Sequence, residues 1–329
     1  MNERATREDE GAAGGAAAGG GAAGDRGLHK VVDSGAGEQH ATVSPEVQLC
    51  FEACGRPADP LVLLITGLGL DLCWWRDVFF TRLADRGFHP VRFDNRDVGR
   101  STHFHGPGVS ALQFLRRTAK PTYTLADMAD DAAGLIEHLA PRRGAHVVGA
   151  SMGSFIAQEL AIRHPGRVRS LVSIMGRPGD RSSGRVAKSM LPEFIRVTPA
   201  DPGRAVEHLV KNFRRIGSVN RTAEDDEDVR IAMRRSMTRE QGDGTGSGRQ
   251  LAAILAERDR TSDLRHVEIP TTVIHGLRDR VVLPSGGRAT ADAIPNAQLV
   301  EVPGMGHDLP RWVSPLVLGA IERTAARAR

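Results

Sequence analysis

Short apolar runs alternate with amphipathic segments along most of the chain. Residues 61–65 (Leu-Val-Leu-Leu-Ile) form a continuous apolar run, which is typical of a strand covered on both faces in a parallel sheet. Residues 77–86 and 124–139 instead carry apolar side chains at helical spacing. Further strands are predicted at residues 90–94, 145–148, 168–175, 271–276 and 298–302, further helices at residues 154–164 and 312–328, and a hairpin at residues 41–53. This pattern predicts an α/β fold with a mostly parallel, doubly wound sheet.

The alternation of strands and helices breaks between residues 176 and 263. This stretch has no comparable strand, only helical patterns at residues 205–213, 229–237 and 250–258. We expect the acidic residues 224–228 to form a solvated helix start, and residues 242–248 to form a flexible loop. The pattern predicts a helical cap at residues 176–263, inserted into a core made of residues 28–175 and 264–329.

Composition indicates a globular protein without a nucleic-acid or membrane partner. The 329 residues are 40% hydrophobic and 26% charged, and the net charge is only +4, with basic residues scattered along the chain. No apolar run approaches the length of a membrane span. Residues 1–27 are rich in Ala and Gly, lack the features of a signal peptide and are predicted to be disordered. Cys50, Cys54 and Cys73 are expected to be reduced thiols, so we predict a cytoplasmic protein.

A serine between two glycines follows the strand predicted at residues 145–148. The segment Gly149-Ala150-Ser151-Met152-Gly153 has the form of a strand, a sharp turn and a helix, which is the context of a nucleophilic serine. Such a turn strains the serine and exposes its hydroxyl, so the residues two before and two after it must be nearly free of side chains. We therefore expect Ser151 to be a nucleophile.

Two more candidate residues also follow predicted strands. Asp279 comes just after residues 271–276, and His307 lies on a glycine-flanked loop after residues 298–302. Catalytic residues of open α/β sheets gather at the carboxyl ends of the strands. A serine hydroxyl needs a base to take its proton, and the base needs an acid to hold its tautomer. We expect His307 to be the base and Asp279 the acid, with His275 and Asp308 as the respective alternatives.

The glycine-rich loop after residues 61–65 predicts an oxyanion hole. Residues 66–70 (Thr-Gly-Leu-Gly-Leu) can point a backbone N–H toward the serine turn. The predicted oxyanion donors are the N–H groups of Leu68 and Met152. Arg96 and Asp97, in a polar cluster after the next strand, are expected to fasten loops rather than to react. His146 and His164 are likewise expected to be structural.

These motifs together resemble the α/β-hydrolase superfamily. The resemblance covers residues 43–321 and depends on residues 65–69, 94–101, 149–153, 275–279 and 304–308. Within the superfamily the chain is similar to small-molecule carboxylesterases of the aclacinomycin methylesterase type. By motif position, the resemblance implies Ser151 as nucleophile, Asp279 as acid, His307 as base, and Leu68 and Met152 as oxyanion donors. Thr66 departs from the histidine or glycine often found before the oxyanion glycine.

The expected activity is hydrolysis of a carboxylic ester through an acyl-Ser151 intermediate. We expect a small, largely apolar ester as substrate, with Trp74, Trp75 and Met175 contacting it near the mouth of the site. No cofactor or metal is expected, and no oligomeric state is predicted. Three alternatives stay open at this point: carbon–carbon bond hydrolysis, acyl transfer by the same triad, and ligand binding with negligible turnover.

Overall fold

The structure is a computed structural model that describes residues 37–106, 108–110, 113, 116, 118–195 and 201–328. The tail predicted to be disordered, residues 1–27, lies outside the described residues. Residues 28–36, the first part of the predicted core, also lie outside them.

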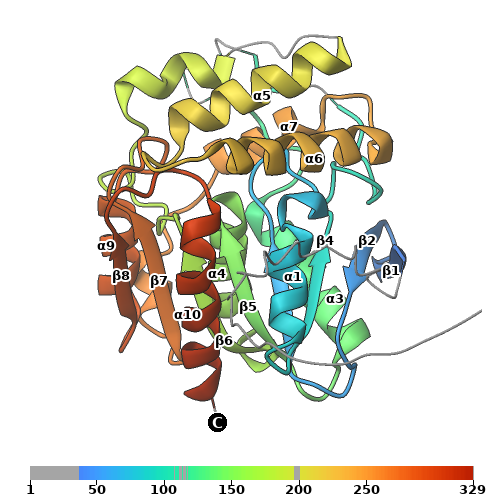
Figure 1. Ribbon diagram of the computed structural model, residues 1–329. Coiled ribbons are helices and arrows are strands. Elements are labelled where there is room, and N and C mark those ends of the chain that lie inside the picture. The colour runs from blue at the N-terminus through green and yellow to red at the C-terminus, as the bar shows by residue number, and fades with distance from the viewer. Residues whose placement is uncertain are drawn as a thin grey trace, which may run out of the picture. The chain divides into compact units, whose positions relative to one another are not determined.

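Eight strands form one sheet in the order β1-β2-β4-β3-β5-β6-β7-β8 (Figure 1). Strand β2 runs antiparallel to both of its neighbours, and all pairs from β4 to β8 are parallel. The predicted α/β fold with a mostly parallel sheet is therefore confirmed. The strands are β1 (Gln39–Ser44), β2 (Val47–Ala53), β3 (Leu61–Ile65), β4 (His89–Phe93), β5 (Ala145–Ala150), β6 (Val168–Ile174), β7 (Thr271–Gly276) and β8 (Gln298–Val302).

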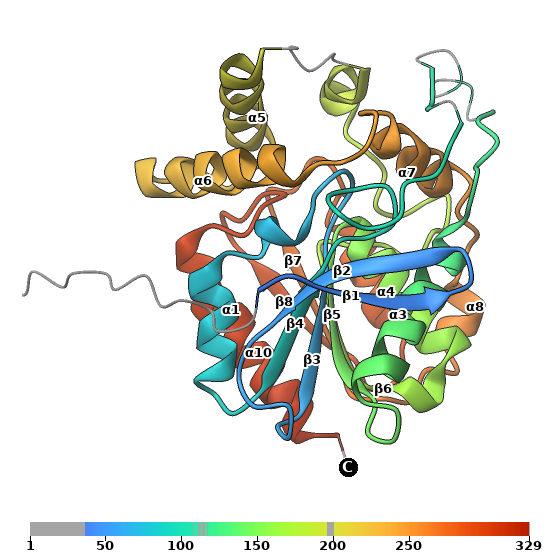
Figure 2. The same ribbon diagram turned by 90° about the vertical axis from the view of Figure 1, so that its right-hand side faces the viewer.

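Helices cover both faces of this sheet (Figure 2). In β3, Leu61, Leu63 and Ile65 join the apolar cluster on one face of the sheet, whereas Val62 and Leu64 join the cluster on the other face. Successive side chains of a strand point to opposite faces, so a strand covered on both sides must be apolar throughout. One face carries α1 (Asp77–Ala84) and α10 (Ser314–Ala326), and the other carries α3 (Leu125–Leu139), α4 (Met152–Arg163), α8 (Thr261–Leu264) and α9 (Ser285–Ala293).

The helical stretch between β6 and β7 lies over the end of the sheet at which the parallel strands finish (Figures 1 and 2). It is joined to the loop after β3 by a hydrogen bond from the Gly69 N–H to Gln250, and to the loop after β8 by one from the Ser218 N–H to Asp308. Within the described part of residues 176–263 no strand occurs. We call this stretch the helical insertion. Its main elements are η3 (Lys188–Ile195), α5 (Pro202–Ile216), α6 (Ala223–Arg239) and α7 (Gly246–Leu255).

The prediction of a flexible loop at residues 242–248 is wrong for the second half of that segment. Helix α7 begins at Gly246, and its first turn packs against the loop after β4. A Cβ atom on Gly246 would lie only 2.0 Å from the backbone oxygen of Asp97, and one on Gly248 would lie 2.8 Å from the Cα of Gly108. These glycines therefore allow a helix to pack closely against its neighbour. In a sequence they cannot be distinguished from glycines that make a loop flexible.

The acidic start of α6, predicted to be solvated, is only partly so: Glu224 and Glu227 are exposed, but Asp225 and Asp226 are buried. Asp225 and Asp226 are 3% and 4% exposed. Asp226 accepts hydrogen bonds from Arg214 and Arg221, and Asp225 accepts one from the backbone N–H of Arg311. The prediction failed for these two residues because their partners lie outside α6: Arg214 on α5, Arg221 on the loop before α6, and the backbone N–H of Arg311 in the segment after β8.

Candidate active site

The turn between β5 and α4 holds Ser151 in a strained backbone conformation. Its φ and ψ are 55° and −122°, in a region that residues with a side chain rarely adopt. A Cβ atom on Gly149 would lie 2.1 Å from the backbone oxygen of Gly153, and one on Gly153 would lie 2.2 Å from that of Ile65. Any side chain at either glycine would collide with main chain, so both glycines are needed for this turn.

The side chains of Ser151, His307 and Asp279 form a continuous chain of hydrogen bonds. Nε2 of His307 lies 2.9 Å from Oγ of Ser151, and Nδ1 of His307 lies 2.7 Å from Oδ2 of Asp279. The three residues follow β5, β8 and β7, whose carboxyl ends meet at one edge of the sheet. The fold thus brings together three residues that lie far apart in the chain.

Asp279 is held in one orientation and in its charged form. Its Oδ1 accepts the backbone N–H groups of Val281 and Val282, both at 2.9 Å. Burial raises the pKa of Asp279, but the charge of His307 and hydrogen bonds from His275 and His307 outweigh it and bring the pKa down to about 2. An ionised carboxylate only accepts hydrogen bonds, so in the neutral imidazole Nδ1 of His307 carries the proton and Nε2 accepts from the Ser151 hydroxyl.

The alternative base and acid lie elsewhere. Nε2 of the fully buried His275 donates to the backbone oxygen of Val282 at 2.8 Å and lies 3.5 Å from Oδ2 of Asp279. The Asp308 carboxylate accepts from Ser218 and Arg221 in the helical insertion. Neither side chain is hydrogen-bonded to the hydroxyl of Ser151. His146 pairs with Ser170 and His164 with Asp130, as expected of structural histidines.

The glycine-rich loop at residues 66–70 packs directly against Ser151. A Cβ atom on Gly67 would lie 3.7 Å from the Ser151 hydroxyl oxygen, which places the neighbouring Leu68 beside the turn at Ser151. The Thr66 hydroxyl donates to the backbone oxygen of Leu70 at 2.9 Å and accepts from the Asn95 amide at 3.1 Å. Thr66, the departure noted in the sequence, thus ties the two ends of the loop together. Met152, the other predicted donor, is the first residue of α4.

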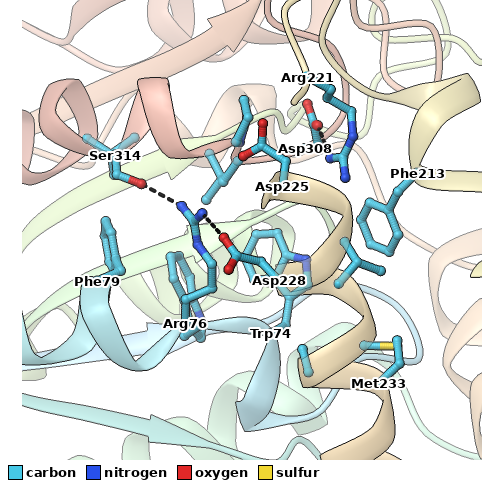
Figure 3. A pocket seen from close by; sticks show the side chains of 16 residues that line it. Trp74, Arg76, Phe79, Phe213, Arg221, Asp225, Asp228, Met233, Asp308 and Ser314 are labelled. Carbon is cyan, nitrogen blue, oxygen red and sulfur yellow. Dashed lines mark hydrogen bonds and ion pairs between the residues drawn. The ribbon is translucent and has the colours of Figure 1, made fainter. Parts of the chain in front are cut away.

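The three predicted substrate-contacting residues differ in their exposure. Trp75 and Met175 are 2% and 1% exposed and belong to the core under α1 and α10, whereas Trp74 is only partly buried. Trp74 and Trp75 both line the cavity drawn in Figure 3, between α1, α6 and the segment that follows His307. Ser151 and His307 are not among the residues that line this cavity. Contact of Trp74, Trp75 and Met175 with a substrate stays a prediction.

Arg96 and Asp97 fasten loops, as predicted. Asp97, at φ 72°, accepts from the Tyr123 hydroxyl at 2.6 Å and from the backbone N–H of Phe104 at 2.7 Å. Arg96 forms a two-pronged pair with Asp131 on α3. The polar cluster after β4 therefore consists of anchors and does not contribute to the hydrogen-bonded chain at Ser151.

Three buried residues of the helical insertion support the site and were missed by the sequence analysis. Arg239 pairs with Asp71 and Asp94, Arg249 pairs with Asp97, and Gln250 bonds to the loop at residues 66–70. Their side chains are between 0% and 2% exposed. In the sequence they are ordinary polar residues of amphipathic helices, so no local signal distinguishes them from a solvated face.

No helix among the described residues is long and apolar enough to cross a membrane. The same residues contain no group of three or more His, Cys, Asp or Glu side chains arranged to hold a metal ion.

Comparison with known proteins places this chain in a family. Residues 60–310 match the family model described as alpha/beta hydrolase fold, and the chain belongs to that family. The chain is 30% identical to a rhodomycin D methylesterase of Streptomyces peucetius and 29% identical to one of another Streptomyces species, each match covering 84% of this chain and 94% of the relative. An esterase from Rhodococcus sp. ECU1013 shares the fold, with a TM-score of 0.69 and 18% identity over 89% of this chain and 99% of that one. The superfamily and type suggested by the motifs are confirmed.

Proposed function

We propose that this protein is a serine hydrolase that cleaves a carboxylic ester of a small, largely apolar molecule through an acyl-Ser151 intermediate. The observation that carries the proposal is the hydrogen-bonded chain from Ser151 through His307 to the ionised Asp279. Two relatives that match most of the chain are named methylesterases, which supports an ester as the substrate and a methyl ester as the first one to test.

In the proposed reaction, Nε2 of His307 takes the hydroxyl proton of Ser151 as the oxygen attacks the ester carbonyl. The carbonyl oxygen becomes an oxyanion that accepts hydrogen bonds from the N–H groups of Leu68 and Met152. His307 then gives its proton to the departing alcohol, leaving an acyl-serine. A water molecule, deprotonated by His307, repeats the attack on the acyl group, and the acid is released as Ser151 regains its proton. Asp279 stabilises the charged imidazole in both halves.

The proposed apolar substrate fits the side chains beside the site. Leu68 and Trp74 are both only partly buried, and both lie on the segment between β3 and α1 that borders the nucleophile turn. An acyl or alcohol group without charge would bury favourably against such surfaces.

The proposal is tested by substituting Ser151→Ala and measuring hydrolysis of a series of 4-nitrophenyl and methyl esters. We expect turnover to disappear while the urea unfolding curve stays that of a folded protein. Covalent labelling by a fluorophosphonate should be seen in the wild type and be absent from the variant. Unchanged ester turnover in Ser151→Ala would refute the proposal.

The same labelling and turnover assays distinguish the alternative activities of this fold. A wild-type protein that is labelled by the fluorophosphonate but hydrolyses no ester would have to be assayed for cleavage of β-diketones and for transfer of the acyl group to alcohols. Labelling without any turnover would indicate a ligand-binding member of the family.

We also propose a cytoplasmic location. Cys50, Cys54 and Cys73 are all free thiols in the structure, and two of them are buried. This state of the cysteines fits a reducing compartment.

A further inference from the structure

Gln250 of α7 reaches from the helical insertion to the loop that carries the proposed oxyanion donor. Its Oε1 accepts the backbone N–H of Gly69 at 2.8 Å, and its Nε2 donates to the backbone oxygen of Arg96, also at 2.8 Å. The side chain is fully buried. Because one partner only donates and the other only accepts, the amide fits in one orientation alone. Gln250 therefore clamps the loops after β3 and β4 to each other.

The loop at residues 66–70 needs such a clamp. Leu68 stands between two glycines, and Gly69 has a φ of 66°, so the backbone on both sides of Leu68 can turn easily. On the Gly67 side, the backbone oxygen of that residue accepts from the N–H of Leu70 at 3.3 Å. On the Gly69 side, the hydrogen bond to Gln250 holds the peptide that links Leu68 to Gly69.

The contact between α7 and this loop is close as well as polar. A Cβ atom on Gly69 would lie 3.1 Å from the Cβ of Ser247, so the first turn of α7 lies directly against the loop. The adjacent Arg249 fixes the same turn of the helix to Asp97 through two hydrogen bonds of 2.8 Å. The amide of Gln250 is thus presented by a helix that is itself anchored to the core.

We propose that Gln250 is a positioning residue for transition-state stabilisation. By holding the Leu68–Gly69 peptide, it keeps the N–H of Leu68 directed at the place where the oxyanion forms. Through it the helical insertion takes part in catalysis in addition to covering the site. This inference rests on the proposed function, because it assigns the oxyanion contact to Leu68.

The test is Gln250→Met, which keeps the length of the side chain and removes both hydrogen bonds. We expect kcat for a 4-nitrophenyl ester to fall by roughly tenfold to a hundredfold, with KM changed less than about twofold, because only the transition state carries the oxyanion. Affinity for an alkyl trifluoromethyl ketone, which forms an oxyanion adduct with the serine, should fall by a similar factor.

The matched control is Gln158→Met. Gln158 is a fully buried glutamine of α4 that bonds to Ser173 and Arg260 and not to the loop at residues 66–70. We expect this variant to lose stability toward urea while kcat and affinity for the ketone stay within about twofold of the wild type. Equal losses of kcat in both variants would show a general effect of buried amides and overturn the inference.

The pH dependence of kcat in Gln250→Glu is a second test of the role of Gln250. A protonated carboxyl can accept from Gly69 and donate to Arg96, as the amide does, whereas an ionised one cannot donate. The ratio of kcat in this variant to kcat in the wild type should therefore rise as the pH is lowered. A ratio that does not change with pH would contradict the proposal.

Failure of the inference and failure of the proposed function can be told apart. A wild-type protein that neither hydrolyses esters nor reacts with a fluorophosphonate would end the proposed function. An active wild type whose kcat and ketone affinity survive in Gln250→Met would end only the role given to Gln250.

Discussion

The guanidinium of Arg239 lies 2.7 Å from the carboxylate of Asp94, although the two residues are 145 positions apart. Arg239 is the last residue of α6, and Asp94 directly follows β4, so the pair joins the helical insertion to the core. Asp71 is a second partner of the same guanidinium, at 2.5 Å. All three side chains are at most 2% exposed. Removing one member of such a buried set of charges is strongly destabilising, because the charge left without its partner cannot be solvated.

Replacing Arg239 by Met should therefore destabilise the protein. We expect the free energy of unfolding to drop by about 3–5 kcal/mol, since Asp71 and Asp94 would remain buried without their cation. Urea denaturation measures the change. Arg234→Met on the same helix is the control, because its side chain is 63% exposed and should contribute less than about 1 kcal/mol. Similar losses in the two variants would contradict this account.

Gly153→Ala should prevent the turn at Ser151 from forming. The new Cβ would meet the backbone oxygens of Ile65 and Thr66 at 2.2 and 2.6 Å, and neither can move without displacing β3. We expect a loss of about 3 kcal/mol or more, or no folded protein. Gly166→Ala is the control, since a Cβ there has nothing within 4 Å and should leave the unfolding midpoint nearly unchanged.

The strained backbone of Ser151 predicts that glycine is the more stable replacement at this position. Ser151→Gly and Ser151→Ala both lose the hydroxyl, but only glycine adopts a φ of 55° without strain. We expect the glycine variant to be about 1 kcal/mol more stable than the alanine variant in urea. At Ser154, inside α4, the order should reverse by about 0.5–1 kcal/mol. Alanine proving the more stable residue at both positions would show that the turn stores no strain.

Comparing Asp279→Asn with Asp308→Asn should show which of the two carboxylates is the catalytic acid. An amide at 279 can donate to His307 and favour the wrong tautomer, so kcat for ester hydrolysis should fall by about a thousandfold or more. Asp308 bonds to Ser218 and Arg221 instead, so its variant should lose stability and keep kcat within about tenfold. A larger loss of kcat in Asp308→Asn would reverse the assignment.

His146 should make the protein less stable in mild acid. Burial, with a smaller contribution from the charge of Arg169, lowers the pKa of His146 from 6.5 to about 4. The folded state therefore binds the proton less readily than the unfolded state, and stability present above pH 6.5 is lost as the pH falls toward 4. The contribution is on the order of 3 kcal/mol. Urea unfolding of His146→Asn should show a shallower decline over this range, whereas His40→Asn, at an exposed position, should follow the wild type.

Much of the fold follows from local patterns. The fully apolar Leu61–Ile65 implied a strand with a helix layer on each side, and the helix predicted at residues 124–139 begins at a capping box of Thr124 and Asp127. The order serine, acid, histidine, each after a strand, was enough to propose which residues meet. These features depend on side chains close together in the chain, or on the rule that parallel strands end at one edge.

The sequence by itself thus determined the sheet, the helix layers and the candidates Ser151, Asp279 and His307. Only the tertiary structure decided that Asp225 and Asp226 are buried, that α7 begins at Gly246, and that Arg239, Arg249 and Gln250 anchor the helical insertion to the loops of the site. The physical reason is that the burial of a polar side chain depends on its partner. For these residues the partner lies on another element, at a distance along the chain that no periodicity encodes.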